Sequence, residues 1–340
     1  MLACRRYNIG VWMFMAEPLP HVHIITTGGT IAATPSGMLM PADLLATIPD
    51  VGELAEITVE PFLDVGSSWI TPAHWLQLAT RIETLWQTRP ELSGIVITHG
   101  TDTLEETAYF LHLTGRDPRP IVLTGAMRSA QALSADGPAN LRAAIAVAAT
   151  PAARSRGVLV VLDNQIHAAR HVSKAHTLRV DAFTSGAGGV LGTIYEDDLV
   201  WFQAQLSNVP KPFSVSADTT LARVDILYSY VGADGQLIAA AVIAGTRGIV
   251  LASFGSGRLT EGQIAAVQAT LEEGTIVVLS SRVGHGAVEG NYRHNLAMSA
   301  EAQGCVLGGD LSPQKARVLL ILALTHTSNP RTIQELFDQY

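Results

Sequence analysis

The sequence predicts an α/β fold with a larger N-terminal and a smaller C-terminal domain, each built on a mostly parallel sheet. Short apolar, β-rich runs alternate with helical patterns, a segment rich in Pro, Ser and Thr interrupts them, and the alternation then resumes. Strands that helices cover on both faces read as continuous apolar runs. We therefore expect parallel strands joined by crossover helices in both halves.

The expected strands of the larger domain are residues 22–26, 94–98, 121–124 and 158–162. Thr103 and Glu106 have the spacing of a capping box, which predicts a helix that continues through Leu113. Pro138 lies at an early position of an alanine-rich segment that ends at Ala149, which predicts a second helix.

The pattern breaks down between residues 201 and 221, and we expect a linker there. Strands are expected again at 224–228, 248–252 and 275–279, and the pairs Ser312-Pro313 and Asn329-Pro330 predict helix starts. The predicted domains span residues 21–205 and 223–340, with the linker at 206–222.

Composition excludes several classes of protein. Of the 340 residues, 48% are hydrophobic and 15% are charged. Such a chain can bury a sizeable core. The net charge of −8 argues against nucleic-acid binding. No apolar stretch reaches the length of a membrane span, which is roughly 18 residues. The two cysteines, Cys4 and Cys305, lie far apart, which favours a reducing compartment over a disulfide framework.

Residues 1–20 are expected to be a disordered extension or to include a mis-annotated start, with Met15 as another possible start. A signal peptide is the alternative interpretation. The apolar part is short and interrupted, however, and no clear small-x-small cleavage site follows it.

Two threonine-rich turns hold the main candidate chemistry, TTGGTIA at 26–32 and THGTDTLEETAYFL at 98–111. Each follows a predicted strand, and in open α/β sheets ligands bind at this edge. A threonine hydroxyl there can attack a carbonyl once a base removes its proton.

The first turn contains Gly28 and Gly29, which let the backbone approach a ligand, and then Thr30. An ordinary tight turn between strand and helix explains the glycine pair equally well. The segment lacks the Gly-Lys-Ser/Thr ending of a phosphate loop and does not match GxGxxG.

The second turn gathers His99, Thr101, Asp102 and Thr103. Thr103 is explained as a helix cap and Asp102 as a charge that complements the helix dipole, whereas Thr101 has no such structural duty. His99 is a possible general base, but a structural role is the more common one for a single histidine.

Two further segments contain candidate site residues. Lys174 follows the strand expected at 158–162, and partial burial would make it a usable base; a solvated surface lysine is the alternative. Ser67 and Ser68 belong to the turn DVGSS, which could bind the α-carboxylate of a small amino acid or be an ordinary turn.

Together, the two turns resemble the paired signatures of the bacterial-type L-asparaginases, the asparaginase/glutaminase family. The resemblance continues in family order over about residues 21–340, in LTGAMR (123–128), SADGPANL (134–141), RGVLVVLDN (156–164), SSRV (280–283) and LSPQKARVLL (311–320).

The resemblance implies hydrolysis of L-asparagine to L-aspartate and ammonia without a metal or an organic cofactor. Thr30 matches the nucleophile that forms an acyl-enzyme. Thr101 matches the family's second threonine, and Asp102 and Lys174 match its proton-relay partners. The resemblance also implies a homotetramer, a dimer of dimers, with active sites between subunits.

The substrate-binding residues follow from the same resemblance. Ser67 matches a ligand of the substrate carboxylate, and Asp102 also matches the contact to the α-ammonium group. Gly29 and Ala126 fall in turns near the scissile amide, where backbone donors would stabilise the oxyanion. Ser68 stands where secreted members commonly have glutamine.

Several positions depart from the family pattern. The loop at 34–40 lacks the tyrosine that helps to deprotonate the nucleophile, so Lys174 and Asp102 activate Thr30 alone or another group substitutes. Arg258 stands where members often place an asparagine that reaches a neighbouring subunit. Glu289 is the candidate for the neighbouring-subunit glutamate. The cysteine pair of many periplasmic members is absent.

The leading hypothesis is therefore an asparaginase in the cytoplasm, with the periplasm as the alternative location. A glutaminase or another small amidase is a second hypothesis, because the changed loop and Arg258 could reshape the pocket. A non-catalytic amino-acid-binding module is a third, since a fold alone does not define a function. A nucleotide-binding oxidoreductase would need a glycine fingerprint that this sequence lacks.

Overall fold

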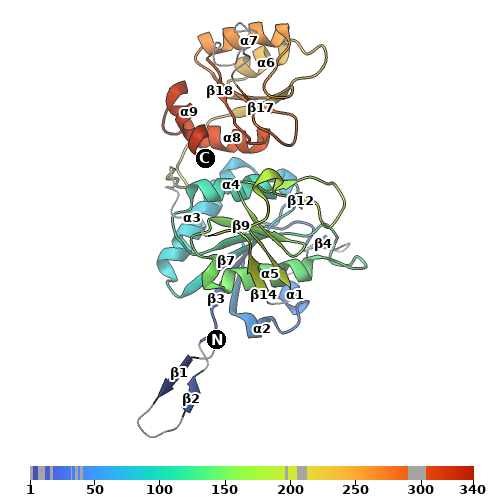
Figure 1. Cartoon of the computed structure of the whole chain (residues 1–340), viewed down its shortest axis with the longest axis vertical. Helices are drawn as coiled ribbons and strands as arrows, with labels where there is room; N and C mark the ends of the chain where they lie inside the picture. The colour runs from blue at the N-terminus through green and yellow to red at the C-terminus, as the bar shows by residue number, and fades with distance from the viewer. Residues whose placement is uncertain are drawn as a thin grey trace.

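A computed structural model describes residues 3–6, 12–15, 18–31, 33–34, 37–38, 41–195, 198–204, 213–289 and 304–340. Figure 1 shows two α/β domains joined end to end, with the C-terminal part of the chain, from β15 (Val224–Tyr228) onward, forming the smaller one. The expected fold class is confirmed.

The larger domain contains an eight-stranded sheet in the order β14-β13-β10-β9-β8-β7-β3-β6. Its parallel strands are β6 (Glu56–Pro61), β3 (His21–Thr26), β7 (Leu92–Thr98), β8 (Ile121–Thr124) and β9 (Val158–Leu162). The antiparallel strands β10 (Gln165–Ala168), β13 (Gly192–Tyr195) and β14 (Asp198–Trp201) complete one side. Every strand predicted for this domain is present, with small differences at the ends.

Helices cover both faces of this sheet. Alternate residues of β7 point to opposite sides, so that Ile95 and Ile97 belong to one core and Val96 to another. Helices α3 (Pro72–Thr88) and α4 (Leu104–Thr114) pack on the first side. Helix α5 (Gly137–Ala149) packs on the other, together with α1 (Pro41–Ala46) and α2 (Val51–Leu54).

The smaller domain has a four-stranded parallel sheet in the order β15-β16-β17-β18, formed by Val224–Tyr228, Gly248–Ser253, Ile276–Ser281 and Val306–Leu307. Helices α6 (Gln236–Ile243) and α7 (Glu261–Glu272) cover its outer face. Helices α8 (Pro313–Ala323) and α9 (Pro330–Gln339) lie on the face toward the larger domain (Figure 1).

The two domains share a continuous apolar core. Tyr109 and Phe110 of α4 belong to the same buried cluster as Leu319 and Leu320 of α8. The hydroxyl of Tyr109 also donates to the carbonyl of Tyr340, the last residue of the chain, at 2.9 Å. The position of α8 is therefore linked to that of α4, and α4 begins just after the second threonine turn.

Both predicted starts of the C-terminal helices are confirmed. The Ser312 hydroxyl accepts from the backbone N–H of Lys315, and the Asn329 side chain accepts from the N–H groups of Arg331 and Thr332. In each case proline takes the first helical position, where a missing N–H costs nothing.

The capping box predicted at Thr103 is wrong. Thr103 does precede α4, but its side chain makes no cap hydrogen bond and instead donates to the carbonyl of Ser67 at 2.8 Å. Glu106 faces Arg317 of α8, 3.9 Å away. A tertiary carbonyl acceptor has taken the place of the local N–H donor as the partner of this hydroxyl, and the bond ties the second threonine turn to the serine turn.

Other segments lie partly outside the described residues. Near the N-terminus, β1 (Ala3–Arg6) and β2 (Trp12–Met15) pair in antiparallel fashion, and whether residues 1–20 are an extension stays a prediction. Strands β4 (Ala33–Thr34) and β5 (Gly37–Met38) form a hairpin, while positions 35, 36, 39 and 40 of the loop without tyrosine lie outside the description. Residues 205–212 of the expected linker also lie outside it, and the exact domain bounds stay a prediction.

Candidate active site

The two threonine turns meet at the carboxyl edge of the large sheet. Strands β3 and β7 are parallel neighbours in which Thr26 pairs with Thr98. Beyond the strands, a Cβ atom placed on Gly29 would lie 2.6 Å from both Cα and N of Gly100. The turns therefore touch backbone to backbone, which places Thr30 and Thr101 each one residue from the contact.

The first turn depends on its glycines. Gly28 and Gly29 both have φ of 93°, in the left-handed region that disfavours side chains. A Cβ on Gly28 would also lie 2.6 Å from the carbonyl oxygen of Val65. Both positions thus exclude larger residues sterically and conformationally, and Thr30 follows them as a half-buried residue.

The serine turn lies on the other side of Gly100. Ser67 is 4% exposed, and a Cβ on Gly100 would lie 2.7 Å from its Oγ. The Ser67 hydroxyl accepts from the backbone N–H of Asp102 at 3.2 Å. The structure therefore brings Ser67 against the second threonine turn, whereas the neighbouring Ser68 is exposed.

Lys174 joins the second threonine turn through its side chain. Its Nζ donates to Thr101 Oγ1 at 2.8 Å and to Asp102 Oδ1 at 2.7 Å. The lysine side chain is 17% exposed and that of Asp102 is 67% exposed, so the ion pair lies at the mouth of the site. The alternative of a solvated surface lysine is therefore wrong.

Strand β11 (Ser173–Lys174) carries this lysine, and it pairs in antiparallel fashion with β12 (Phe183–Thr184). Beside the ion pair, a cavity of about 340 Å³ is lined by Asp102, Glu105, Glu106, Lys174, Ala175, His176, Thr177 and Gln314. A larger cavity of about 480 Å³ lies between the segments that precede β7, β8 and β9, and none of the predicted site residues line it.

His99 is structural. It is fully buried, and burial lowers the pKa of its imidazole to about 4, so the ring is neutral near pH 7. Its Nδ1 donates to the carbonyl of Gly100 at 2.7 Å, and its Nε2 accepts from Thr107 at 2.9 Å. Thr107 in turn accepts from Trp75 at 2.9 Å. This chain of hydrogen bonds holds the Gly100 turn and leaves no ring nitrogen free to act as a base.

The turn that contains Ala126 closes the site from the β8 side. Ala126 is 1% exposed, and a Cβ on the preceding Gly125 would lie 2.5 Å from the carbonyl oxygen of His99. The predicted site residues that follow β3, β7 and β8, which are Thr30, Thr101 and Ala126, therefore lie in turns that contact one another.

Two residues that hold this turn were missed by sequence reasoning. Asp136 accepts from the N–H groups of Met127 and Arg128, both at 2.9 Å. Asn140 donates to the carbonyl of Gly125 at 3.0 Å. The motif SADGPANL contains both residues, but the family resemblance gives neither of them a role.

Arg258 and Glu289 lie in the smaller domain. Both are exposed, and the N–H of Glu289 donates to the carbonyl of Ser256, two residues before Arg258, at 3.0 Å. The structure thus brings these two candidates together on one surface. Their contact with a neighbouring subunit stays a prediction.

Among the described residues, no three His, Cys, Asp or Glu side chains gather in a way that could hold a metal ion. Within the same residues, none of the helices is both long and apolar enough to cross a membrane. The groups gathered at the two threonine turns are hydroxyls, the Lys174 ammonium, the Asp102 carboxylate and backbone amides.

The fold and the site define a class: a two-domain α/β protein that gathers two threonine turns and a lysine–aspartate pair at the carboxyl edge of its larger sheet. Residues 21–207 match the family model "Asparaginase, N-terminal", and residues 223–337 match the "Glutaminase/Asparaginase C-terminal domain". The chain belongs to the asparaginase family.

Relatives match over most of their length. L-asparaginase 2 of Bacillus subtilis (strain 168) is 40% identical over 95% of this chain and 88% of its own. A glutaminase-asparaginase of Pseudomonas fluorescens biotype A is 35% identical over 95% and 91%. The crystal structure of a probable cytoplasmic L-asparaginase from Campylobacter jejuni has a TM-score of 0.88 and 42% identity, and it covers 94% of this chain and 100% of that one.

Proposed function

We propose that this chain hydrolyses L-asparagine to L-aspartate and ammonia, with Thr30 as the nucleophile. The contact of Lys174 Nζ with both Thr101 Oγ1 and Asp102 Oδ1 carries this proposal, because a binding module would need no such hydrogen-bonded chain beside two threonine turns. Membership of the asparaginase family supports the same reaction.

The reaction has two halves. The Thr30 hydroxyl attacks the side-chain amide carbon, and ammonia leaves when the C–N bond breaks and the nitrogen gains a proton. Water then cleaves the resulting ester, which releases L-aspartate and restores the hydroxyl. Thr101, Lys174 and Asp102 form the path along which a proton moves during both halves. No metal or organic cofactor takes part in these steps.

Substrate binding is assigned to the groups around the turns. Ser67, which is buried against Gly100, would hold the α-carboxylate together with Ser68. The Asp102 carboxylate would bind the α-ammonium group. Backbone donors of the turns at Gly29 and Ala126 would stabilise the oxyanion, often the largest catalytic contribution.

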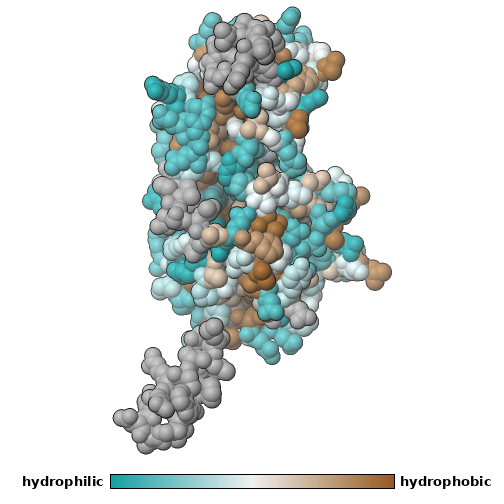
Figure 2. Space-filling view, in the orientation of Figure 1, coloured by the Kyte–Doolittle hydropathy of each residue, from teal (hydrophilic) through white to brown (hydrophobic). Residues whose placement is uncertain are grey.

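The location and assembly are also proposals. We propose a cytoplasmic homotetramer, a dimer of dimers, in which Arg258 and Glu289 act at the site of a neighbouring subunit. Large apolar side chains are exposed on this protomer, among them Val231 at 93% and Ile243 at 88%, and Figure 2 shows apolar groups scattered among polar ones on one face. Light scattering combined with size-exclusion chromatography tests the assembly, because a monomer would contradict it.

The experiment that tests the function measures ammonia release from asparagine and from glutamine by the wild type, Thr30→Ala and Thr84→Ala. Thr84 is an exposed threonine of α3, so its substitution controls for the loss of a hydroxyl elsewhere. We expect release from asparagine by the wild type and by Thr84→Ala but not by Thr30→Ala. A faster release from glutamine would favour the glutaminase hypothesis.

Two other outcomes would change the assignment. A wild type that releases ammonia from neither substrate would contradict both amidase hypotheses and favour the amino-acid-binding module. Full activity in Thr30→Ala would show that the nucleophile is wrong. Thr101 would then be the next candidate, since its hydroxyl is the one in contact with Lys174.

A further inference from the structure

Residues at the start of helix α4 bind both the backbone and the side chain of Lys174. The side-chain Nζ contacts Thr101 and Asp102, and the backbone N–H of Lys174 donates to Glu105 Oε2 at 2.6 Å. These three partners belong to one short segment that leads into the first turn of α4. Both the backbone N–H and the side-chain amine of Lys174 are therefore fixed against a single element.

Glu105 is a carboxyl group with almost no contact to water. It is 7% exposed, and it also accepts a hydrogen bond from the side chain of Ser173. Burial raises the pKa of this carboxyl, whereas the charge of Lys315 and the hydrogen bonds from Lys174 and Ser173 oppose the shift. A buried charge needs such compensation to be tolerated.

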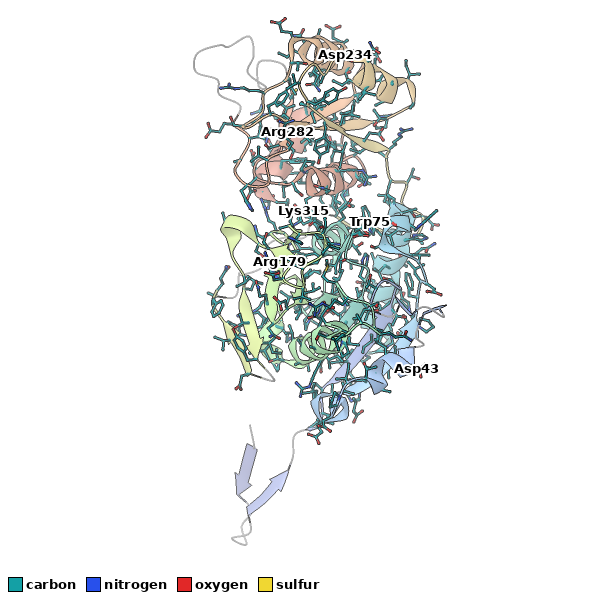
Figure 3. The ribbon with its side chains drawn as sticks, turned by 90° about the vertical axis from the view of Figure 1, so that its right-hand side faces the viewer. Asp43, Trp75, Arg179, Asp234, Arg282 and Lys315 are labelled. Carbon is teal, nitrogen blue, oxygen red and sulfur yellow. The ribbon has the colours of Figure 1, made fainter. Side chains whose placement is uncertain are left out.

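Lys315 supplies the opposite charge from the smaller domain. It lies in the first turn of α8, is 2% exposed, and sits at the boundary between the domains in Figure 3. Its Nζ donates to the carbonyl of Arg170 at 3.0 Å and to that of Val172, which immediately precede β11. The ammonium also lies 5.9 Å from the ring centroid of Tyr109.

The short segment 170–174 is thus held from two domains. Lys315 binds its carbonyl groups from α8, and Glu105 binds the N–H of Lys174 from α4. Glu105 and Lys315 interact through their charges. Replacing buried charges of opposite sign by apolar residues is often neutral or stabilising, so stability alone is a poor explanation of these two groups. A positioning role explains why both charges converge on the strand that carries Lys174.

We infer that Glu105 and Lys315 are a positioning pair that sets the place of Lys174 against Thr101. Neither group contacts Thr30 or Thr101 in the arrangement described above, and both act through the main chain of residues 170–174. The inference rests on the proposed function, because it assigns the pair a role only if Lys174 is part of the catalytic relay. It also makes the smaller domain a determinant of turnover within its own protomer.

The first experiment compares asparagine hydrolysis by the full chain carrying Glu105→Gln, Lys315→Met or Arg317→Met. Arg317 is the matched control, since it lies on the same helix and faces the larger domain through Glu106, 3.9 Å away. A small displacement of a catalytic group can lower the rate about 100-fold. We expect kcat to fall about ten- to 100-fold in the first two variants, with little change in KM, and to stay near the wild-type value in Arg317→Met.

The second experiment is a double-mutant cycle between Glu105→Gln and Lys174→Met. If Glu105 acts through Lys174, adding Glu105→Gln to Lys174→Met causes no further loss of kcat. Losses that multiply would overturn the inference, because independent sites are additive in free energy. A purely structural role of Glu105 predicts that multiplication, or else no loss of kcat in the single variant.

The outcomes separate the inference from the proposed function. A wild type without activity, or a Lys174→Met variant with normal turnover, contradicts the proposed function or its relay. An active wild type, an impaired Lys174→Met and a normal Glu105→Gln contradict only the positioning pair. Should Lys315→Met fail to fold, the cycle with the nearly isosteric Glu105→Gln decides by itself.

Discussion

Lys174 Nζ lies 2.8 Å from Thr101 Oγ1, although the two residues are 73 positions apart in the sequence. The contact joins the turn after β7 to strand β11, which follows the β9–β10 hairpin in the chain. Thr101 is 6% exposed, so this hydroxyl is held within the protein and has a cation as its partner. Such a pair can pass a proton only while its geometry is maintained.

The substitution Lys174→Met is expected to lower kcat for asparagine by at least about 100-fold, the lower end of the contribution of general acid–base catalysis. Methionine keeps much of the side-chain volume but removes the donor to Thr101 and Asp102. Because the ion pair lies at the mouth of the site, we expect little change in the melting temperature. Steady-state kinetics and thermal unfolding of the same preparation measure both quantities.

Arg179→Met is the matched control for Lys174→Met. Arg179 lies five positions further along the chain and pairs with Asp181, but its side chain is 64% exposed. Removing this cation should leave kcat unchanged. Normal turnover in Lys174→Met, or an equal loss in Arg179→Met, would contradict the role of Lys174 as a relay.

The sequence predicted the sheet and the place of the site because both depend on local patterns. Apolar runs marked the strands, and Thr30, Thr101 and Ala126 follow β3, β7 and β8 at the edge where parallel strands end. The partner of Lys174 could not be read from spacing, because it depends on where β11 lies relative to the turn after β7. Only the family resemblance indicated that pairing.

Tertiary contacts also changed the roles of residues whose local sequence pattern predicted something else or predicted nothing. Thr103 had the spacing of a capping residue, yet the nearby carbonyl of Ser67 binds its hydroxyl instead. Glu105 and Lys315 are charged residues far apart in the sequence, and contacts with residues 170–174 and between α4 and α8 bury them. Sequence reasoning gave no role to either residue for this reason.

Gly29→Ala should abolish activity and cost more stability than a change of backbone preference alone. The new Cβ would be 2.6 Å from two backbone atoms of Gly100, at a φ of 93°. Gly245→Ala is the matched control, because its φ is 83° and no atom lies within 4 Å of the new Cβ. The control should lose about 1–2 kcal/mol of unfolding free energy and keep its activity. Equal losses in chemical unfolding would show that the contact between the turns adjusts freely.

Ser67→Ala is expected to raise KM for asparagine more than it lowers kcat. The variant loses the proposed ligand of the substrate carboxylate and the acceptor for the N–H of Asp102. Losing a hydrogen bond to a charged group costs about 1.5–3 kcal/mol, which corresponds to a KM increase of roughly ten- to 100-fold. Kinetics over a wide range of asparagine concentrations separate the two constants. A change confined to kcat would contradict the assignment of Ser67 to carboxylate binding.

His99 should lower the free energy of unfolding as the pH falls from about 6.5 to about 4, whereas the carboxyl of Glu106, whose pKa burial raises to about 7, acts in the opposite direction. Burial lowers the pKa of His99 from 6.5 to about 4 in the folded protein. In this pH range the unfolded chain therefore binds a proton that the folded chain excludes, so acid favours unfolding. The full difference corresponds to about 3 kcal/mol, most of which accumulates before pH 4 is reached.

Urea unfolding of the wild type and of His99→Gln at a series of pH values between 7 and 4 measures this contribution. The variant should be less stable at pH 7, because the hydrogen bonds to Gly100 and Thr107 are disturbed. Its stability should nevertheless depend less steeply on pH, since one buried imidazole is missing. His167, whose pKa burial also lowers to about 4, and Glu106, whose pKa burial raises to about 7, remain in both proteins and contribute to the residual slope with opposite signs. Identical slopes in the two proteins would show that His99 takes up its proton without unfolding, and its role as a neutral support of the Gly100 turn would then be wrong.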